Sequence, residues 1–96
     1  MNISFCKDSG ALTVVLEGRL DTTTAPEFEK FLEENCVDIH MLTLDCEKLA
    51  YISSAGLRVL LATHKKMKAA LKLTNVCELV MEVFEMTGFA DILMIE

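Results

Sequence analysis

Residues 51–61 read YISSAGLRVLL, and this stretch marks the entry into the longest predicted helix of the chain. Its two serines, Ser53 and Ser54, stand where a helical pattern begins, and a serine at that position can accept a backbone N–H. One face of the following helix is apolar, with a histidine at its edge: Leu57, Leu60, Leu61, His64 and Met67. The pattern predicts a helix over about Ala55–Ala69, with the serines at its N-terminal end.

Two strands are predicted at the N-terminus of the chain. Residues 1–7 alternate apolar and polar side chains, which places Ile3 and Phe5 on one face. Residues 12–17 alternate in the same way. The turn at 8–10 between them contains aspartate, serine and glycine. Because this turn is short, the two strands are expected to form a hairpin.

A further helix is predicted after the hairpin. Three threonines at 22–24 offer hydroxyl groups for its start, and Glu27 lies three residues after Thr24, which is the spacing of a capping box. The helix is expected to run to about Asn35, and a loop follows at 38–40. Three residues form its apolar stripe: Phe28, Phe31 and Leu32.

The rest of the chain predicts three further strands: residues 41–45, 71–74 and 92–95. A loop is expected over 47–52, and a helix over 78–86 is expected to end at Gly88. The inward face of that helix is predicted to carry Leu79, Val83 and Phe84. The order is then β-β-α-β-α-β-α-β, in which helices between strands demand crossovers and a largely parallel sheet. The N-terminal hairpin makes the sheet mixed.

Length and charge exclude several classes of protein. The 96 residues suit one domain spanning 1–96. The formal net charge is −6, and the best basic cluster, residues 64–68, suits a solvated helix end, so no direct nucleic-acid binding is expected. The chain has no run of ~20 apolar residues and no signal-peptide pattern. Membrane insertion is therefore not expected, and the predicted location is the cytoplasm.

The reactive side chains predict neither a metal site nor an enzyme. The four cysteines form no Cys-x-x-Cys pair, and neither histidine stands at metal-ligand spacing from one of them. No Gly-rich phosphate loop, paired catalytic carboxylates or Cys-His-acid order is present. We therefore expect that the thiols are reduced and that the chain binds no metal and no cofactor. Its function is expected to be binding rather than catalysis.

Residues 51–61 resemble the signature of STAS domains, whose commonest form is Asp-Ser-Ser-Gly-Leu at the start of the second helix. Other segments agree in order. Residues 18–21, Gly-Arg-Leu-Asp, resemble the family's Gly-x-Leu-Asp, Asp45 closes a strand as in the family, and 78–92 resemble its last helix and strand. The resemblance implies an α/β fold, with a mixed sheet of four to five strands and helices mainly on one face.

The resemblance also implies a function, that of an anti-sigma factor antagonist. In this type of STAS domain, the unphosphorylated protein binds an anti-sigma factor that is usually a serine kinase. Phosphorylation of a serine in the signature releases the complex, and a PP2C-type phosphatase resets it. An alternative function is compatible with the same fold. In it the chain is not phosphorylated and serves as an adaptor subunit of a transporter or signalling complex.

Alignment on Gly56 and Leu57 places the family's usual phosphoacceptor on Ala55, which has no hydroxyl group. Ser54 is therefore the first candidate acceptor and Ser53 the second, although either serine could serve only as a helix cap. The partner-binding residues expected from the resemblance are Asp21, Thr22, Ile52, Ala55, Gly56 and Arg58.

Three of these residues also have structural interpretations. Asp21 could be a turn or cap residue. Arg58 lies in the first helical turn, where a cation opposes the helix dipole. It is either solvated or paired with a partner's acid or a phosphate. Gly56 costs up to ~1 kcal/mol in a helix relative to alanine, which a close approach by a partner, by the loop at Asp21 or by the interior would explain.

Overall fold

The computed structural model describes residues 1–67 and 70–96. In chain order the elements are β1 (Asn2–Asp8), β2 (Ala11–Leu20), α1 (Ala25–Asn35), β3 (Met41–Ile52), α2 (Ser54–Met67), β4 (Leu71–Thr74), α3 (Glu78–Thr87), the 3-10 helix η1 (Phe89–Asp91) and β5 (Met94–Ile95). This confirms the predicted order of strands and helices. The predicted end of the long helix at Ala69 lies outside the described residues.

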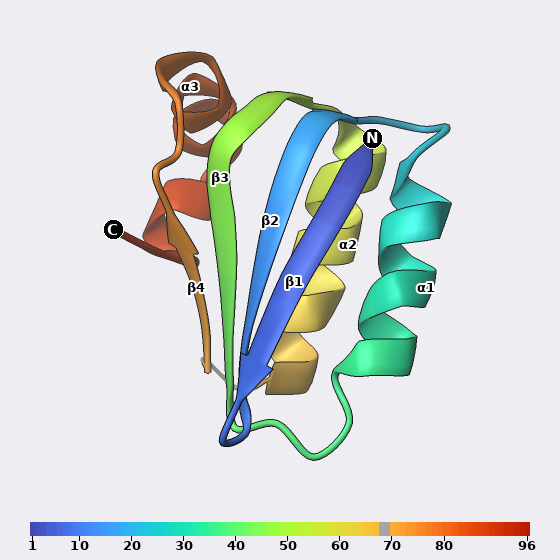
Figure 1. Ribbon diagram of the computed structural model, residues 1–96. Helices are drawn as coiled ribbons and strands as arrows, with labels where there is room; N and C mark the ends of the chain where they lie inside the picture. Colours follow the sequence, from blue (N-terminus) through green and yellow to red (C-terminus); the bar gives the residue numbers. More distant parts are fainter. Residues whose placement is uncertain (68–69) are drawn as a thin grey trace.

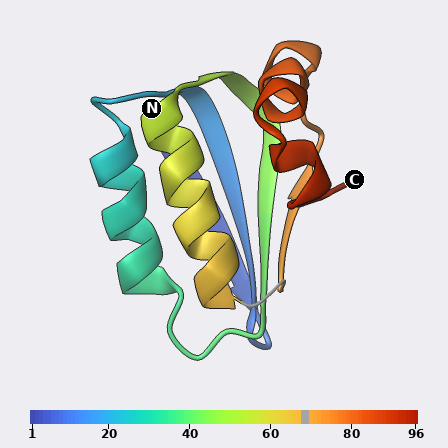
Figure 2. The same ribbon diagram turned by 180° about the vertical axis from the view of Figure 1, so that it is seen from behind.

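The described strands form one sheet in the order β1-β2-β3-β4-β5. β1 is antiparallel to β2, and every other neighbouring pair is parallel. In Figure 1 the sheet lies nearer the viewer and α1 and α2 lie behind it. Figure 2 gives the opposite view, in which α1 and α2 lie nearer the viewer and cover the sheet. The predicted mixed sheet with helices on one face is confirmed. Both views place α1 and α3 at opposite ends of the helix layer.

The core lies between the sheet and the helix layer. Buried and more accessible residues alternate along β2, as the two-residue period of a strand requires. The buried positions include Leu12, Val14 and Leu16. Phe28 of α1 and Phe84 of α3 are fully buried over this face. Each such phenylalanine contributes about 1.5–3 kcal/mol through burial. No described helix is long and apolar enough to cross a membrane.

The buried faces of two helices differ from the predicted ones. In α3, Val80 and Phe84 are buried, whereas Leu79 is 54% exposed and Val83 is half-buried. The buried face of α3 is therefore shifted from Leu79 and Val83 to the residues one position later, and these two buried residues lie four positions apart on the side of the helix that meets the sheet. In α2 the buried residues are Gly56, Leu57, Val59, Leu60 and Thr63. The predicted Leu61, His64 and Met67 are half-buried at the margin of that face.

The predicted loop at 47–52 is instead the second half of β3. β2 also runs on to Leu20, and the two strands pair in parallel until Leu20 meets Ile52. The register shifts along this stretch, and Glu47 and Lys48 are both exposed, so the simple alternation that marks a strand is lost. Because β2 and β3 end together, the loop after β2 lies beside the start of α2. At the C-terminus the last strand is shorter than predicted. The N–H groups of Ile92 and Leu93 donate to the carbonyl oxygen of Phe89, so these two residues belong to the turn after η1 and not to β5.

Candidate functional site

The ends of β2 and β3 support a surface that we call the shoulder, formed by residues 21–24 and 53–58. The backbone N–H of Ser53 donates to the carbonyl oxygen of Leu20 at 2.9 Å, which ties the two segments together. The shoulder therefore brings together residues that are about thirty positions apart in the sequence.

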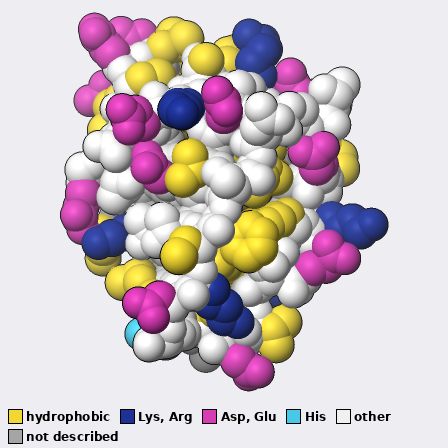
Figure 3. Space-filling model, in the orientation of Figure 1, with side chains coloured by type: hydrophobic (Ala, Val, Ile, Leu, Met, Phe, Trp, Pro, Cys, Tyr) yellow, Lys and Arg dark blue, Asp and Glu magenta, His cyan; other side chains and the backbone are white. Residues whose placement is uncertain are grey.

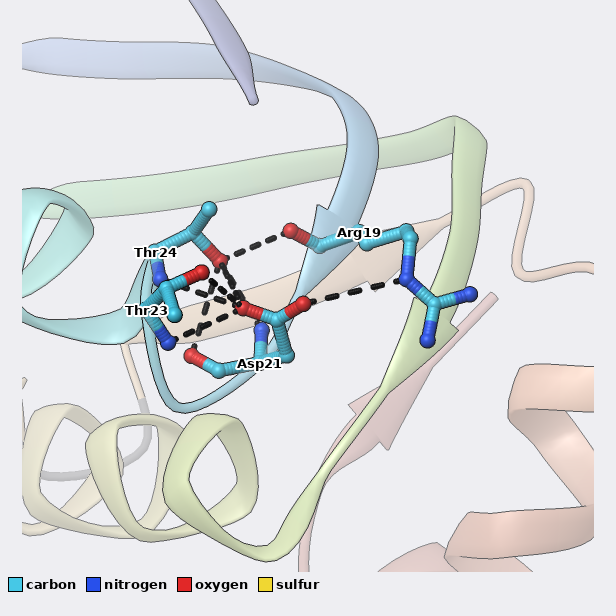
Figure 4. Close-up of polar contacts among 4 residues, drawn as sticks. All are labelled: Arg19, Asp21, Thr23 and Thr24. Carbon is cyan, nitrogen blue, oxygen red and sulfur yellow. Dashed lines mark hydrogen bonds and ion pairs between the residues drawn. The ribbon is translucent and has the colours of Figure 1, made fainter.

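The first half of the shoulder is a loop organised by Asp21 (Figure 4). One carboxylate oxygen of Asp21 accepts from the backbone N–H of Thr23 at 3.0 Å, from the Thr23 hydroxyl at 2.8 Å and from the Thr24 N–H at 3.2 Å. Its carbonyl oxygen accepts from the N–H of Ala25 at 2.8 Å, at the start of α1. The turn-and-cap interpretation of Asp21 therefore matches its contacts.

The predicted capping box of α1 is not formed. Thr24 occupies the N-cap position but makes no side-chain cap hydrogen bond. Its hydroxyl points back to the strand, where it donates to the carbonyl oxygen of Arg19 at 2.7 Å and accepts from the N–H of Asp21 at 2.8 Å. The prediction that Thr24 and Glu27 pair reciprocally is therefore wrong, because the Thr24 hydroxyl group binds backbone groups of Arg19 and Asp21 instead.

Electrostatics fix the loop further. The hydrogen bond from the Thr23 hydroxyl, aided by the N–H groups of Thr23 and Thr24, holds the pKa of the Asp21 carboxyl below its usual value, against an opposing effect of desolvation. The Arg19 Nε lies 3.7 Å from the other Asp21 carboxylate oxygen. The Arg19 guanidinium carbon also lies 4.1 Å from the centre of the Tyr51 ring, a cation–π geometry.

Sequence reasoning did not place Arg19 and Tyr51 together. The two residues are partners across β2 and β3, in the stretch of β3 that was predicted to be a loop. A strand over this stretch, in parallel register with β2, pairs the two residues. Arg19 thus lies next to the shoulder and connects Asp21 to the end of β3.

The two candidate serines differ sharply in access. Ser54 is the first residue of α2 and is exposed. Ser53 is half-buried, and its hydroxyl oxygen is enclosed and finds no hydrogen-bond partner in the part of the chain that the structure describes. The carbonyl oxygen of Ser53 accepts from the N–H of Leu57 at 2.9 Å, which starts the helix. Of the two hydroxyl groups, only that of Ser54 is open to another protein in this structure.

Two of the expected contact residues lie inside the molecule. Ile52 is 2% exposed, and Gly56 is buried on the inner face of α2. A Cβ atom on Gly56 would lie within 3.0 Å of Leu20 and Ile52 atoms, so the glycine is explained by interior packing. The expectation that these two residues contact a partner is corrected on this ground, and their role is to support the shoulder from beneath.

Three of the four remaining contact residues, all except Asp21, line a groove between α1 and α2. Thr22, Ala55 and Arg58 line its open end, and its volume is about 390 Å³. The far wall includes Pro26 and Glu29 of α1. Arg58 is exposed there, one helical turn after Ser54. The groove therefore presents a cation, an anion and apolar surface next to an accessible serine hydroxyl.

The chemistry available at the shoulder is that of binding and modification. The N-terminus of a helix has backbone N–H groups without helical partners and favours anions, so a phosphate on Ser54 would be tolerated there. Among the described residues, no group of three or more His, Cys, Asp or Glu side chains is placed to hold a metal ion.

Comparison with known proteins places the chain in one family and identifies relatives of similar length. The sequence matches the STAS domain family over residues 2–96. BtrV of Bordetella bronchiseptica is 37% identical over 97 residues, which cover 96% of this chain and 83% of that protein. The anti-sigma-B factor antagonist of Bacillus subtilis is 31% identical over 99 residues, covering 97% and 88% respectively.

Solved structures share the fold. An anti-sigma factor antagonist from Mycobacterium paratuberculosis has a TM-score of 0.87 at 21% identity, covering 98% of this chain and 83% of that one. The antagonist SpoIIAA in its unphosphorylated form has a TM-score of 0.82 at 17% identity, covering 99% and 88%. Its phosphorylated form from Bacillus has a TM-score of 0.74 at 16% identity, covering 99% and 91%. At these identities the likeness shows the fold alone.

Proposed function

This chain belongs to the STAS domain family, and from that membership we propose that it is an anti-sigma factor antagonist controlled by phosphorylation of Ser54. The regulatory STAS proteins that it resembles are binding proteins rather than enzymes. In this proposal the unphosphorylated chain binds an anti-sigma factor of the serine-kinase type and thereby frees the sigma factor. Phosphorylation then ends the complex, and a PP2C-type phosphatase restores it.

The observation that carries the proposal is the accessible hydroxyl of Ser54 at the start of α2. Ala55 stands at the family's usual acceptor position and cannot be phosphorylated. Ser53 offers a hydroxyl group that is enclosed by protein. Ser54 is therefore the one serine of the signature whose hydroxyl group is exposed.

The proposed docking surface is the open end of the groove beside Ser54. Thr22, Ala55 and Arg58 line it, and the loop held by Asp21 fixes its shape. A cation at Arg58 opposes the helix dipole, which is unfavourable for the isolated helix by ~0.3–1 kcal/mol. An acidic group of the kinase, or the phosphate on Ser54 itself, would offset that cost.

Phosphorylation would act on the complex rather than on the fold. A phosphate adds nearly two negative charges, which the helix N-terminus accommodates. A partner carboxylate ~6 Å away would be repelled by roughly 5 kcal/mol at an effective dielectric constant of 20, or by about 1 kcal/mol in water. Since ~1.4 kcal/mol is a tenfold change in affinity, this range is sufficient to release a modest complex.

The direct test is to incubate the protein with ATP and its cognate anti-sigma kinase, and to map the phosphate by mass spectrometry over residues 51–58. We expect the modification on Ser54, its loss in Ser54→Ala and its retention in Ser53→Ala. Treatment with a PP2C-type phosphatase should then restore kinase binding. A chain that carries no phosphate after this incubation, and whose complex with its partner persists in the presence of ATP, would favour the adaptor function. Phosphate on Ser53 would refute the assignment to Ser54.

A further inference from the structure

Away from the shoulder, α3 carries an exposed apolar stripe. Leu79, Val83 and Met86 follow one another at i, i+4 and i+7, so they line one side of the helix. Leu79 is 54% exposed and Met86 is 86% exposed, while Val83 is half-buried between them. A different side of α3 packs into the core, where Val80 and Phe84 are buried. Val83 still packs partly against the core, whereas Leu79 and Met86 at the two ends of the stripe are left exposed by the fold.

An acidic stripe runs along α3 beside the apolar one. Glu78, Glu82 and Glu85 share the same i, i+4, i+7 spacing, and all three are exposed. Each precedes a member of the apolar stripe by one position, which places the two stripes about 100° apart around the helix. The top left of Figure 3, where Figure 1 draws α3, shows acidic and hydrophobic side chains side by side.

The glutamates of this acidic stripe have no ion-pair partner among the described residues. No lysine or arginine follows Lys72 in the sequence. The ion pairs of the described residues are Arg19–Asp21 and Lys72–Glu96, so none of the three glutamates of α3 has one there. Like charges at i and i+4 on a helix repel each other. The stripe thus carries a small unfavourable energy that a positively charged neighbour would relieve.

We propose that the solvent side of α3 is a second docking surface, and that its occupant is a partner protein segment with an apolar row beside a row of lysines or arginines. An amphipathic basic helix meets this requirement, because its rows repeat with the same pitch as those of α3. A second copy of this chain that docked through the same surface would bring an identical acidic stripe. An anionic lipid surface would be repelled. Charge complementarity therefore selects a basic protein segment.

This surface is separate from the shoulder. Figures 1 and 2 place α3 at the end of the helix layer opposite α1, whereas the groove beside Ser54 lies between α1 and α2. Binding at α3 should then be independent of the state of Ser54. An anti-sigma factor antagonist with this arrangement can hold one partner at α3 while it exchanges another at the shoulder.

The surface can be tested with a fluorescently labelled helical peptide that has leucines on one face and lysines beside them, followed by fluorescence anisotropy. We expect binding that weakens with salt, and no binding of a matched peptide with glutamates in place of the lysines. The triple variant E78K/E82K/E85K should bind the lysine peptide about tenfold more weakly or worse, since exposed ion pairs contribute modestly each. Met86→Ser should also weaken binding, whereas Val37→Ser, which alters another exposed apolar residue, should not.

The occupant can be tested in cells with a photo-crosslinking amino acid at position 86 and a control at position 37. Capture of a protein through a basic, apolar peptide, lost in E78K/E82K/E85K, supports the proposal. It is overturned by cross-links to a second copy, by cross-links to an acidic segment, by equal capture from position 37, or by no capture at all. Ser54→Asp should leave the cross-link unchanged, so failure of the phosphorylation proposal is distinguishable from failure of this one.

Discussion

The carbonyl oxygen of Leu20 lies 3.0 Å from the point where a Cβ atom on Gly56 would be. The Leu20 Cγ and an Ile52 side-chain carbon are closer still, at 2.8 and 2.9 Å from that point. The first turn of α2 is thus pressed onto the ends of β2 and β3. This contact sets the height of the helix start, and with it the position of Ser54, over the sheet.

Gly56→Ala should therefore destabilise the protein. Alanine gains up to ~1 kcal/mol in helix propensity, but overpacking against a backbone oxygen typically costs ~1–3 kcal/mol. We expect a net loss of about 1–2 kcal/mol in the free energy of unfolding, measured by urea denaturation. Ala62→Gly, an exposed change on the same helix, reports the propensity effect alone. A Gly56→Ala protein more stable than wild type would contradict the close packing.

Thr24→Val should cost about 1–2 kcal/mol of stability, because the Thr24 hydroxyl donates to the carbonyl oxygen of Arg19 and accepts from the N–H of Asp21. Thr22→Val is the matched control, since Thr22 is exposed in the same loop and its hydroxyl makes no hydrogen bond within the described residues. Thermal melts of both variants, followed by circular dichroism, make the comparison. Equal losses for the two variants would argue against the loop geometry.

Asp21 should contribute to stability in a pH-dependent way. Its pKa is lower in the folded protein than in the unfolded chain, so its contribution is present above the unfolded value and is lost as the pH falls through the folded value. Urea denaturation of wild type and Asp21→Asn should show the largest pH-dependent difference above about pH 4, shrinking at lower pH. A difference that grows as the pH falls would reverse the assigned direction.

The thiols should react in an order set by burial. Desolvation raises the pKa of the Cys46 thiol to about 12, and the side chain is 1% exposed, so almost no reactive thiolate is available at pH ~8. Cys6 is exposed on β1. Iodoacetamide labelling followed by mass spectrometry should modify Cys6 first, and Cys46 only after unfolding in urea. Early labelling of Cys46 in the native protein would show that the core opens locally.

Ser54→Asp should weaken binding of the anti-sigma factor while the circular dichroism spectrum stays unchanged, because the side chain is exposed at a helix N-terminus that tolerates negative charge. Isothermal titration calorimetry against the purified partner measures the effect. Ser54→Asn, similar in size but uncharged, separates charge from shape. Unchanged affinity in Ser54→Asp would remove Ser54 as the switch.

Most of the fold could be predicted because its signals are local. β4 was placed at its observed bounds, and Gly88 ends α3 in the left-handed conformation expected of a terminal glycine. The C-terminal half of β3 could not be predicted. Its alternation is broken where Glu47 and Lys48 are both exposed, and only pairing with β2 identifies it as a strand.

The site was predicted in outline, and the errors have a common cause. The exposure of Ser54 and Arg58 follows from a helix start on the surface, which the sequence indicates. The enclosure of Ser53 and the burial of Gly56 depend on how α2 meets the ends of two strands, which is a tertiary contact. The Thr24 hydroxyl likewise had a competing acceptor in Arg19 that no local pattern reveals.

The hydrogen bond from the Ser53 N–H to the Leu20 carbonyl oxygen joins the two segments of the shoulder where β2 and β3 end, so their relative positions are set before a partner arrives. The conformational entropy that is lost in ordering this surface is lost during folding, and not when the partner binds. Changes to exposed uncharged groups should then appear mainly in how long a complex lasts, with little effect on how fast it forms.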